Sequence, residues 1–353
     1  MLKIGIVGLP NVGKSTLFNA LVKGNQAEAS NYPFCTIDPN VGVVEVPDDR
    51  LDRLAEIVKP SKIIPAAIEF VDIAGLVKDA HKGEGLGNQF LSHIREVDAI
   101  AVVVRFFEDG QVSHVDGDID PRRDVETLML EVLMADLQVV SKLYDSAQKA
   151  AKDGSKEHIL ERDELAKIQK GLEKGTPASE IDFSDEIDLP PLISAKPVIY
   201  VANISEDQIS SLPSIPFLPS IPLIPISAKL ESELINLSPE EQQEFLKTYG
   251  LEESGLVRLI RSAYKSLGLI SFYTTQSNQL QAWSIGQGST AYDAAGKIHT
   301  DFQKGFIRAD VVSYDDFLKY QGETGAHDSG RLRSEGRDYV VQDGDVIKFK
   351  FSN

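Results

Sequence analysis

Three residue types near the N-terminus stand at a spacing that could hold a chain of phosphates. The stretch GLPNVGKST places Gly8 five residues before Gly13, which Lys14 and Ser15 follow. Glycines let main-chain N–H groups turn inward around phosphate oxygens. A lysine in this position reaches the β- and γ-phosphates, and the hydroxyl after it ligates Mg²⁺. The spacing predicts a nucleoside triphosphate site with phosphate contacts from Asn11, Val12, Gly13, Lys14, Ser15 and Thr16.

Two further segments could complete a metal site. The run AAIEFVDIAGL predicts a buried strand that ends in Asp72, with Gly75 three residues later. An aspartate in this position holds Mg²⁺ directly or through a water, and the glycine N–H approaches the γ-phosphate. Thr36, in the loop NYPFCTIDPN, is the expected second hydroxyl ligand. The predicted metal ligands are Ser15, Thr36 and Asp72. Lys14 and Gly75 are predicted to contribute to catalysis.

The sequence does not supply the usual partner for an attacking water. In Ras-like proteins the residue after this glycine is a glutamine that orients the water, but here it is Leu76. Hydrolysis is therefore expected to be slow, or another group positions the water. His114 lies in the polar loop EDGQVSHVDGD after the strand-like run AIAVVV, at the edge where phosphates bind in such folds. It is a candidate catalytic histidine, and a solvated loop histidine is the alternative.

The stretch VANISEDQ raises the question of which base is read. A GTP-binding domain usually ends this strand with Asn-Lys-x-Asp, whereas here Asn203, Ile204 and Glu206 occupy the first, second and fourth positions. The usual aspartate accepts from N1–H and the 2-amino group of guanine. By analogy with DNA readout such a pair contributes about 1–3 kcal/mol of discrimination. Glu206 is one methylene longer, so its carboxylate would crowd that edge or turn away.

Adenine does not need this aspartate, because it has no 2-amino group. Asn203 could pair with its N6 and N7, and Ile204 would offer an apolar wall. The later run Ser-Ala-Lys matches the loop that passes under the base in Ras-like folds. The sequence predicts ATP over GTP, with base contacts from Asn203, Ile204, Glu206, Ser227, Ala228 and Lys229.

An α/β scaffold would position these residues. The strand-like residues 4–7 run into the glycine loop, and a helix with one apolar face follows, which is the context that a P-loop requires. KPVIYVAN and IPLIPISAK predict two later strands. The predicted fold is a P-loop NTPase (Ras-like G domain) over residues 1–124 and 195–268, with two additions.

The first addition is a helical hairpin over residues 125–194. From Val125 the apolar period becomes helical, it breaks at KDGSK, and a second stripe follows through residues 165–172. These features predict an antiparallel pair whose first helix has about 25 residues, or roughly 38 Å. Residues 175–195 would form the return linker. A structural insertion and a partner-binding arm both remain open.

The second addition is a separate small α+β domain over residues 269–353. Its expected elements are a strand at SFYTT, helices at TAYDAAGKIHTDF and SYDDFLKY, and a closing hairpin DYVVQDGDVIKFKF with an Asp-Gly turn.

Composition narrows the protein class. The chain has 353 residues, 42% hydrophobic and 25% charged, which are globular values. A single cysteine, Cys35, excludes an intramolecular disulfide and suits a reducing cytoplasm. No run approaches the roughly 20 apolar residues of a membrane span. A net charge of −18 disfavours binding of free DNA or RNA. Residues 255–310 offer a candidate local basic face, with a solvated surface of mixed sign as the alternative. Its cations are Arg258, Arg261, Lys265, Lys297, Lys304 and Arg308, against Asp293, Asp301 and Asp310.

Taken together, these motifs resemble the YchF / Obg-like ATPase family over essentially the full length. The resemblance rests on GLPNVGKST, NYPFCTIDPN, DIAGLVKDAHKGEGLGNQFL, NISE and the C-terminal AAGKIHTDFQKGFIRA with DGDVIKFKF. The C-terminal part is similar to a TGS domain, a β-grasp-like module. The resemblance implies ATP hydrolysis, ribosome association, a regulatory part in translation or stress responses, and a catalytic role for His114. The segment DQISSLPSIPFLPSIPLIPISAK departs from the family, because its prolines leave little room for the helix expected there.

Three functions follow as hypotheses. The first is a slow Mg²⁺-dependent ATPase switch that meets the ribosome through the basic face, the helical arm and the TGS-like domain. The second is a nucleotide-gated ribosome-binding protein whose hydrolysis is incidental. The third is an Obg-type GTPase assembly factor, which Glu206 and Leu76 disfavour. K⁺ held through Asn11 is a further candidate cofactor, because PNVGKS resembles loops of cation-activated relatives.

Overall fold

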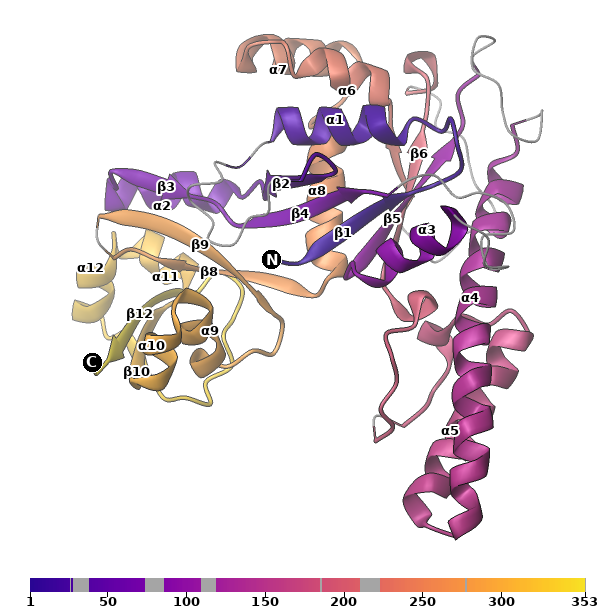
Figure 1. Ribbon diagram of the computed structural model, residues 1–353. Helices are drawn as coiled ribbons and strands as arrows, with labels where there is room; N and C mark the ends of the chain where they lie inside the picture. Colours follow the sequence, from indigo (N-terminus) through magenta and orange to yellow (C-terminus); the bar gives the residue numbers. More distant parts are fainter. Residues whose placement is uncertain are drawn as a thin grey trace.

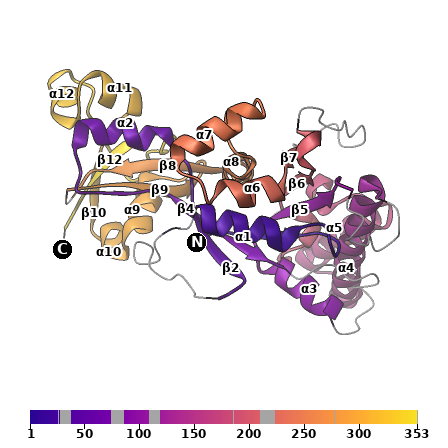
Figure 2. The ribbon, with the colours of Figure 1, turned by 90° about the horizontal axis from the view of Figure 1, so that it is seen from above.

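The computed structural model describes residues 1–25, 27, 38–73, 86–108, 119–184, 186–209, 223–276 and 278–352 (Figure 1). Within these ranges the chain forms two sheets and a helical hairpin. The hairpin and the second sheet lie at opposite ends of the first sheet (Figures 1 and 2). Among the described helices, none combines the length and the apolar character needed to cross a membrane.

The first sheet carries the predicted nucleotide site. Its order is β2-β4-β1-β5-β6-β7, and every neighbouring pair is parallel except β2 with β4. β5 has six apolar residues followed by Arg105, and all seven are buried, as expected for a strand covered on both faces. The predicted α/β fold is confirmed. The strands are β1 (Lys3–Val7), β2 (Val41–Glu45), β4 (Ala67–Asp72), β5 (Ala99–Arg105), β6 (Val198–Asn203) and β7 (Leu223–Ile226).

Helices connect these strands and pack against them. α8 has a capped first turn and one apolar face: Ser254 accepts from the Val257 N–H at 3.2 Å, and Leu259 and Ile260 are buried. α7 buries none of its residues, which explains why apolar periodicity did not predict it. The helices of this part are α1 (Lys14–Gly24), α3 (Leu86–Arg95), α6 (Ala228–Leu234), α7 (Pro239–Thr248) and α8 (Gly255–Ser266).

The predicted helical hairpin is present, and its first helix is longer than expected. α4 (Pro121–Ala150) has 30 residues, or about 45 Å at 1.5 Å per residue. α5 (Lys156–Glu173) returns after a turn at Gly154, whose φ is 76°. The apolar stripe indicated a start at Val125, but the helix begins four residues earlier. Asp120 fixes that start, because its carboxylate accepts from two N–H groups of the first turn.

A buried carboxylate fastens the base of the hairpin to its return segment. Asp136 on α4 is 0% exposed. It accepts from the N–H of Ile193 at 2.9 Å and from the N–H and the hydroxyl of Ser194, both at 2.7 Å. The Ser194 hydroxyl oxygen accepts in turn from the Ala178 N–H at 3.0 Å. Asp136 therefore ties the end of the return segment to α4, and Ser194 joins that end to Ala178 near the beginning of the segment.

Asp136→Asn is expected to lower the free energy of unfolding by about 1–2 kcal/mol, because an accepting oxygen becomes a donor that faces another donor. Urea unfolding followed by circular dichroism measures this change. Asp145→Asn, at an exposed position of the same helix, is the control and should stay within about 0.5 kcal/mol of the parent. Equal stabilities for the two variants would mean that the carboxylate does not anchor the segment.

The C-terminal residues build the second sheet, in the order β11-β10-β12-β8-β9-β3. α9 (Ala291–Ile298) and α10 (Thr300–Lys304) pack on one face and enclose a core that includes Phe272 and Phe349. The predicted single helix is thus two, because the backbone becomes extended at His299, with φ −162°. The strands are β3 (Lys62–Ile64), β8 (Leu269–Thr274), β9 (Gln279–Gly286), β10 (Phe306–Val312), β11 (Arg333–Glu335) and β12 (Val346–Phe351).

The predicted closing hairpin across residues 343–344 is wrong. β12 pairs antiparallel with β10 and parallel with β8, and not with the residues just before the turn. The Asp345 carboxylate gives the physical reason. It accepts from the Gln342 N–H at 2.9 Å and from the Tyr339 hydroxyl at 2.7 Å, so the chain before β12 closes on itself.

One strand of the second sheet comes from outside residues 269–353, the predicted C-terminal domain. β3 comes from the N-terminal third of the chain, yet it is an edge strand of the second sheet, with Ile63 opposite Leu280 in parallel register. α2 (Asp49–Val58) packs against α11 (Tyr314–Lys319), and Figure 2 shows both beside α12 (Glu323–Asp328). Tyr273 of β8 and Val346 of β12 belong to the same hydrophobic core as β1 and β5. The two parts therefore share a core.

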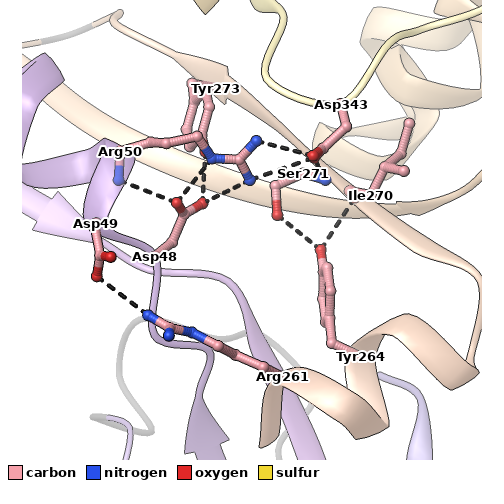
Figure 3. A network of polar contacts seen from close by, with 9 residues as sticks. All are labelled: Asp48, Asp49, Arg50, Arg261, Tyr264, Ile270, Ser271, Tyr273 and Asp343. Atoms are coloured by element: carbon pink, nitrogen blue, oxygen red, sulfur yellow. Dashed lines mark hydrogen bonds and ion pairs between the residues drawn. The ribbon is translucent and has the colours of Figure 1, made fainter. Parts of the chain in front are cut away.

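A polar network fastens this junction (Figure 3). Arg50, in the first turn of α2, donates from Nε to Asp48 at 2.8 Å and from Nη1 to Asp343 at 2.9 Å. The Tyr273 hydroxyl donates to the second oxygen of Asp48 at 2.5 Å. The Asp343 carboxylate also accepts from the Ser271 N–H at 2.9 Å. The Arg50 guanidinium thus joins Asp48, at the start of α2, to Asp343, just before β12. Asp48 in turn binds Tyr273 of β8.

Candidate functional site

The predicted phosphate loop lies between β1 and α1, at the carboxyl edge of the first sheet. Gly13 precedes α1 in the left-handed region, with φ 92°. A Cβ at Gly13 would overlap the side-chain amide nitrogen of Asn203. A glycine is required here both for the backbone conformation and for the close approach of β6. Asn11 is also left-handed, with φ 62°, which asparagine tolerates better than most residues.

Lys14 directly follows this loop as the first residue of α1. Its ammonium donates to the carbonyl oxygens of Leu9 at 2.8 Å and Gly8 at 3.2 Å, and the residue is only 8% exposed. Burial lowers the pKa of Lys14, and the nearby Asp72 carboxylate opposes that effect. An ammonium has three N–H donors, so these two bonds leave one for a phosphate oxygen.

Ser15 and Asp72 fit a magnesium site. Ser15 Oγ lies 3.0 Å from Asp72 Oδ2. Octahedral Mg²⁺ takes oxygens at about 2.0–2.1 Å, which places neighbouring ligands about 2.9 Å apart. The two oxygens therefore have the spacing of adjacent ligands of one ion. Elsewhere in the part of the chain that the structure describes, no three His, Cys, Asp or Glu residues gather into a further metal site.

Several predicted positions lie outside the described residues. They are Thr36, Gly75 and His114, together with Leu76 and the proline-rich residues 210–222. The metal-binding role of Thr36 and the catalytic roles of Gly75 and His114 stay predictions.

Asn203, at the end of β6, connects the phosphate loop to the 227–229 loop. Its Nδ2 donates to the Val12 carbonyl at 2.8 Å, and its Oδ1 accepts from the Ala228 N–H at 3.1 Å. The residue is 5% exposed. One N–H and one lone pair of the amide remain after these bonds. Asn203 thus positions two loops, and its predicted pairing with adenine stays a prediction.

A cleft of about 940 Å³ opens beside the phosphate loop. Ligand pockets usually measure about 300–1,000 Å³, so this cleft can hold a nucleotide. Gly13, Thr16 and all six predicted base contacts line it. Five further lining residues were not predicted from the sequence. Two of them, Phe107 and Glu108, directly follow the strand-like run AIAVVVR, and that position was the available signal. The missed residues are Phe107, Glu108, Ser205, Asp207 and Tyr249.

At the base end of the cleft, Glu206 turns toward Lys229. Its backbone belongs to a 3-10 turn (Glu206–Gln208), which Ser205 and Gln208 close as a capping box, with the Ser205 N–H donating to Gln208 Oε1 at 2.9 Å. Glu206 Oε1 lies 3.0 Å from Lys229 Nζ. This pairing raises the pKa of Lys229. Ile204 also lines the cleft and is largely buried, with 3% of its surface exposed.

Arg105 supports the site from behind and was not predicted. It ends β5 fully buried, donates from Nε to the Phe107 carbonyl at 3.1 Å and from Nη1 to the Asn11 carbonyl at 3.5 Å. Its guanidinium carbon lies 4.5 Å from the centre of the Phe107 ring. An arginine that ends an otherwise apolar strand was the available signal. The K⁺ ion held through Asn11 stays a prediction.

The predicted basic face is weaker than the sequence indicated. Arg261 pairs with Glu253 at 2.6 Å, and Arg308 pairs with Asp310 at 3.2 Å. Arg258 donates to a main-chain carbonyl of β7 at 2.9 Å. Arg261 and Arg308 are therefore ion-paired within the chain, which reduces the positive potential that they offer a polyanion, whereas the carbonyl bond of Arg258 leaves its charge in place.

Two family profiles match the chain. The profile described as "50S ribosome-binding GTPase" matches residues 3–140. The profile YchF-GTPase_C, described as "Protein of unknown function (DUF933)", matches residues 269–352. These ranges contain the phosphate loop and most of the second sheet, respectively.

Full-length relatives are also similar to this chain. The "Ribosome-binding ATPase YchF" of Bacillus subtilis (strain 168) is 48% identical over 364 residues, which covers 99% of each chain. The protein of the same name from Escherichia coli O157:H7 is 48% identical over 360 residues, again 99% of each. The solved structure of the Schizosaccharomyces pombe YchF GTPase aligns with a TM-score of 0.88 at 38% identity, over 99% of this chain and 97% of that one. The chain belongs to the YchF family.

Proposed function

We propose that this chain binds Mg²⁺ and ATP, hydrolyses ATP slowly in preference to GTP, and acts in the cytoplasm as a ribosome-associated regulatory switch. The names of the relatives from Bacillus subtilis and Escherichia coli, both ribosome-binding ATPases, support the coarse activity. The spacing of Ser15 and Asp72 supports the metal. The helical arm and the second sheet lie at opposite ends of the first sheet, which carries the cleft (Figure 1). They are the proposed contacts to the ribosome.

The orientation of Glu206 carries the proposed preference for ATP. Guanine recognition needs a carboxylate that accepts from N1–H and from the 2-amino group together. Here Glu206 Oε1 is paired with Lys229 at 3.0 Å within the cleft wall. A guanine would have to draw the acid away from its lysine, whereas adenine presents no pair of donors that needs it. In this orientation Glu206 would not offer GTP the paired hydrogen bonds that the aspartate of GTP-binding domains supplies.

Five residues have proposed roles around the phosphates. Lys14 would bind the β- and γ-phosphates, and Ser15 and Asp72 would hold Mg²⁺, which when bound offsets the phosphate charge. Arg105 and Asn203 would keep the loop in place through the carbonyls of Asn11 and Val12. Leu76 cannot orient a water, which supports slow turnover.

Titration calorimetry with ATP and with GTP tests the proposal. With Mg²⁺ present, ATP is expected to bind about tenfold more tightly than GTP, the size of one lost base-edge contact. Chelation of Mg²⁺ with EDTA is expected to weaken both nucleotides together, because the metal does not contact the base. Equal or tighter binding of GTP would refute the adenine preference, and insensitivity to EDTA would refute the metal site.

A further inference from the structure

A tyrosine from a distant segment completes the environment of Glu206. Tyr249 follows α7 and lines the same cleft as Glu206 and Lys229. Its hydroxyl donates to Glu206 Oε2 at 3.4 Å, while Lys229 lies at Oε1. Each carboxylate oxygen thus faces a donor that belongs to the cleft wall.

The lysine alone is a weak restraint on the carboxylate. The Lys229 side chain is 76% exposed, and exposed ion pairs are screened by water and lose side-chain entropy. The tyrosine is better fixed. Its ring lies 5.3 Å from the ring of Phe245, centre to centre, and α7 is tied to α6 through Gln242, whose Nε2 donates to the Leu234 carbonyl at 3.0 Å. A tyrosine has only two side-chain torsions to order.

The Tyr249 hydroxyl stays protonated at neutral pH and can therefore donate a hydrogen bond. Desolvation and the negative charge of Glu206 raise the pKa of Tyr249, so the hydroxyl keeps its proton. A protonated phenol beside an ionised carboxylate can only donate, which matches the direction of the bond from Tyr249 to Glu206.

We propose that Tyr249 is a base-selectivity residue, which holds the Glu206 carboxylate along the cleft wall and away from the edge of a guanine. This inference rests on the proposed preference for ATP and names the group that enforces it. Guanine would have to draw Glu206 away from both groups; water can replace the carboxylate at the exposed Lys229, but the part-buried Tyr249 hydroxyl would lose its acceptor at a cost in free energy. Adenine requires no such rearrangement. Selectivity then comes from an element that penalises the wrong base.

Tyr249→Phe is the decisive variant, because it keeps the ring and its contact with Phe245 and removes only the hydroxyl. ATP, GTP and ITP, which lacks the 2-amino group, are titrated against both proteins. The ratio of ATP affinity to GTP affinity is expected to fall about threefold; the effect is modest because 3.4 Å exceeds the roughly 2.7–2.8 Å of a strong O–H···O bond. The affinity for ITP should change less than the affinity for GTP, because the base of ITP has the N1–H donor but no 2-amino group to reach Glu206.

A second background separates this role from a direct contact with the base. In Glu206→Ala, the further change Tyr249→Phe is expected to leave the ratio unaltered, because the proposed role acts only through the carboxylate. An unchanged ratio in the single variant, or an equal change in both backgrounds, would overturn the proposal. Failure of the ATP preference itself would appear in the unmodified protein as tighter GTP binding, whatever Tyr249→Phe does.

Discussion

Lys14→Ala is expected to lower steady-state ATP turnover by roughly a hundredfold to a thousandfold, the cost of removing one preorganised charge from the transition state of a transfer reaction. The ammonium is buried and is held at the phosphate loop by the carbonyls of Gly8 and Leu9. Nothing else in that loop carries a positive charge. Release of inorganic phosphate at saturating ATP measures the effect. Lys23→Ala, an exposed lysine in the last turn of the same helix, is the matched control.

Retained turnover in Lys14→Ala, with circular dichroism equal to that of the control, would contradict the assignment of the phosphate site. His114→Ala, at the predicted catalytic histidine, distinguishes two of the proposed functions, because it leaves the phosphate loop and Lys14 in place. If hydrolysis resets a switch, co-sedimentation with ribosomes should no longer respond to ATP. If the chain is a nucleotide-gated binder whose hydrolysis is incidental, the response should persist in any variant that still binds ATP but does not cleave it.

The sequence predicted the parts of the fold that depend on local patterns. The glycine loop, its strand and its helix follow from residues 4–22, because turn chemistry and apolar period agree there. The buried run of β5 and the helical hairpin were predicted for the same reason. Even so, the start of α4 was misplaced by four residues, since the Asp120 cap and Pro121 determine it and the apolar stripe begins only at Val125.

Long-range pairing was the part that the sequence could not show. β3 is three residues long between Pro60 and Pro65, and its partner β9 lies more than 200 residues away. No periodicity can appear in so short a run. The Asp-Gly pair at 343–344 is a strong local hairpin signal, but β12 gains two partners, β10 and β8, by leaving the residues before it. Tertiary pairing outweighed the local preference.

The candidate site likewise has residues that local patterns predicted and one that only the tertiary fold brings in. Lys14, Ser15, Asp72 and Asn203 stand at the predicted loop and strand ends, because strands in a parallel sheet bring their carboxyl ends to one edge. Tyr249 could not be found, since it lies 43 residues after Glu206 and reaches the cleft only through the docking of α7 on α6.

Arg50→Ala is expected to lower the free energy of unfolding by about 2–3 kcal/mol. Removal of one partner from a buried charge pair usually costs about 3–5 kcal/mol, and this pair is partly open, with Arg50 29% exposed and Asp48 11% exposed in their side chains. Asp48 would keep the Tyr273 hydroxyl but lose its cation, and Asp343 would lose two hydrogen bonds. Thermal and urea unfolding measure the loss, with Arg53→Ala, an exposed arginine of the same helix, as the control.

The pH dependence of stability tests the same junction through Asp48. Burial alone would raise the pKa of Asp48, but hydrogen bonds from Arg50 and Tyr273 outweigh burial and hold it below the ordinary value of 3.8. A carboxyl with a lowered folded pKa adds stability that is fully present above its unfolded pKa and is lost as pH falls through the folded pKa. The parent should therefore lose stability below about pH 4 more steeply than Asp48→Asn, in which this group no longer titrates. Parallel acid limbs for the two proteins, with Asp52→Asn from the exposed side of α2 as reference, would show that the network does not hold Asp48 ionised and that the two sheets are joined by the shared apolar core alone.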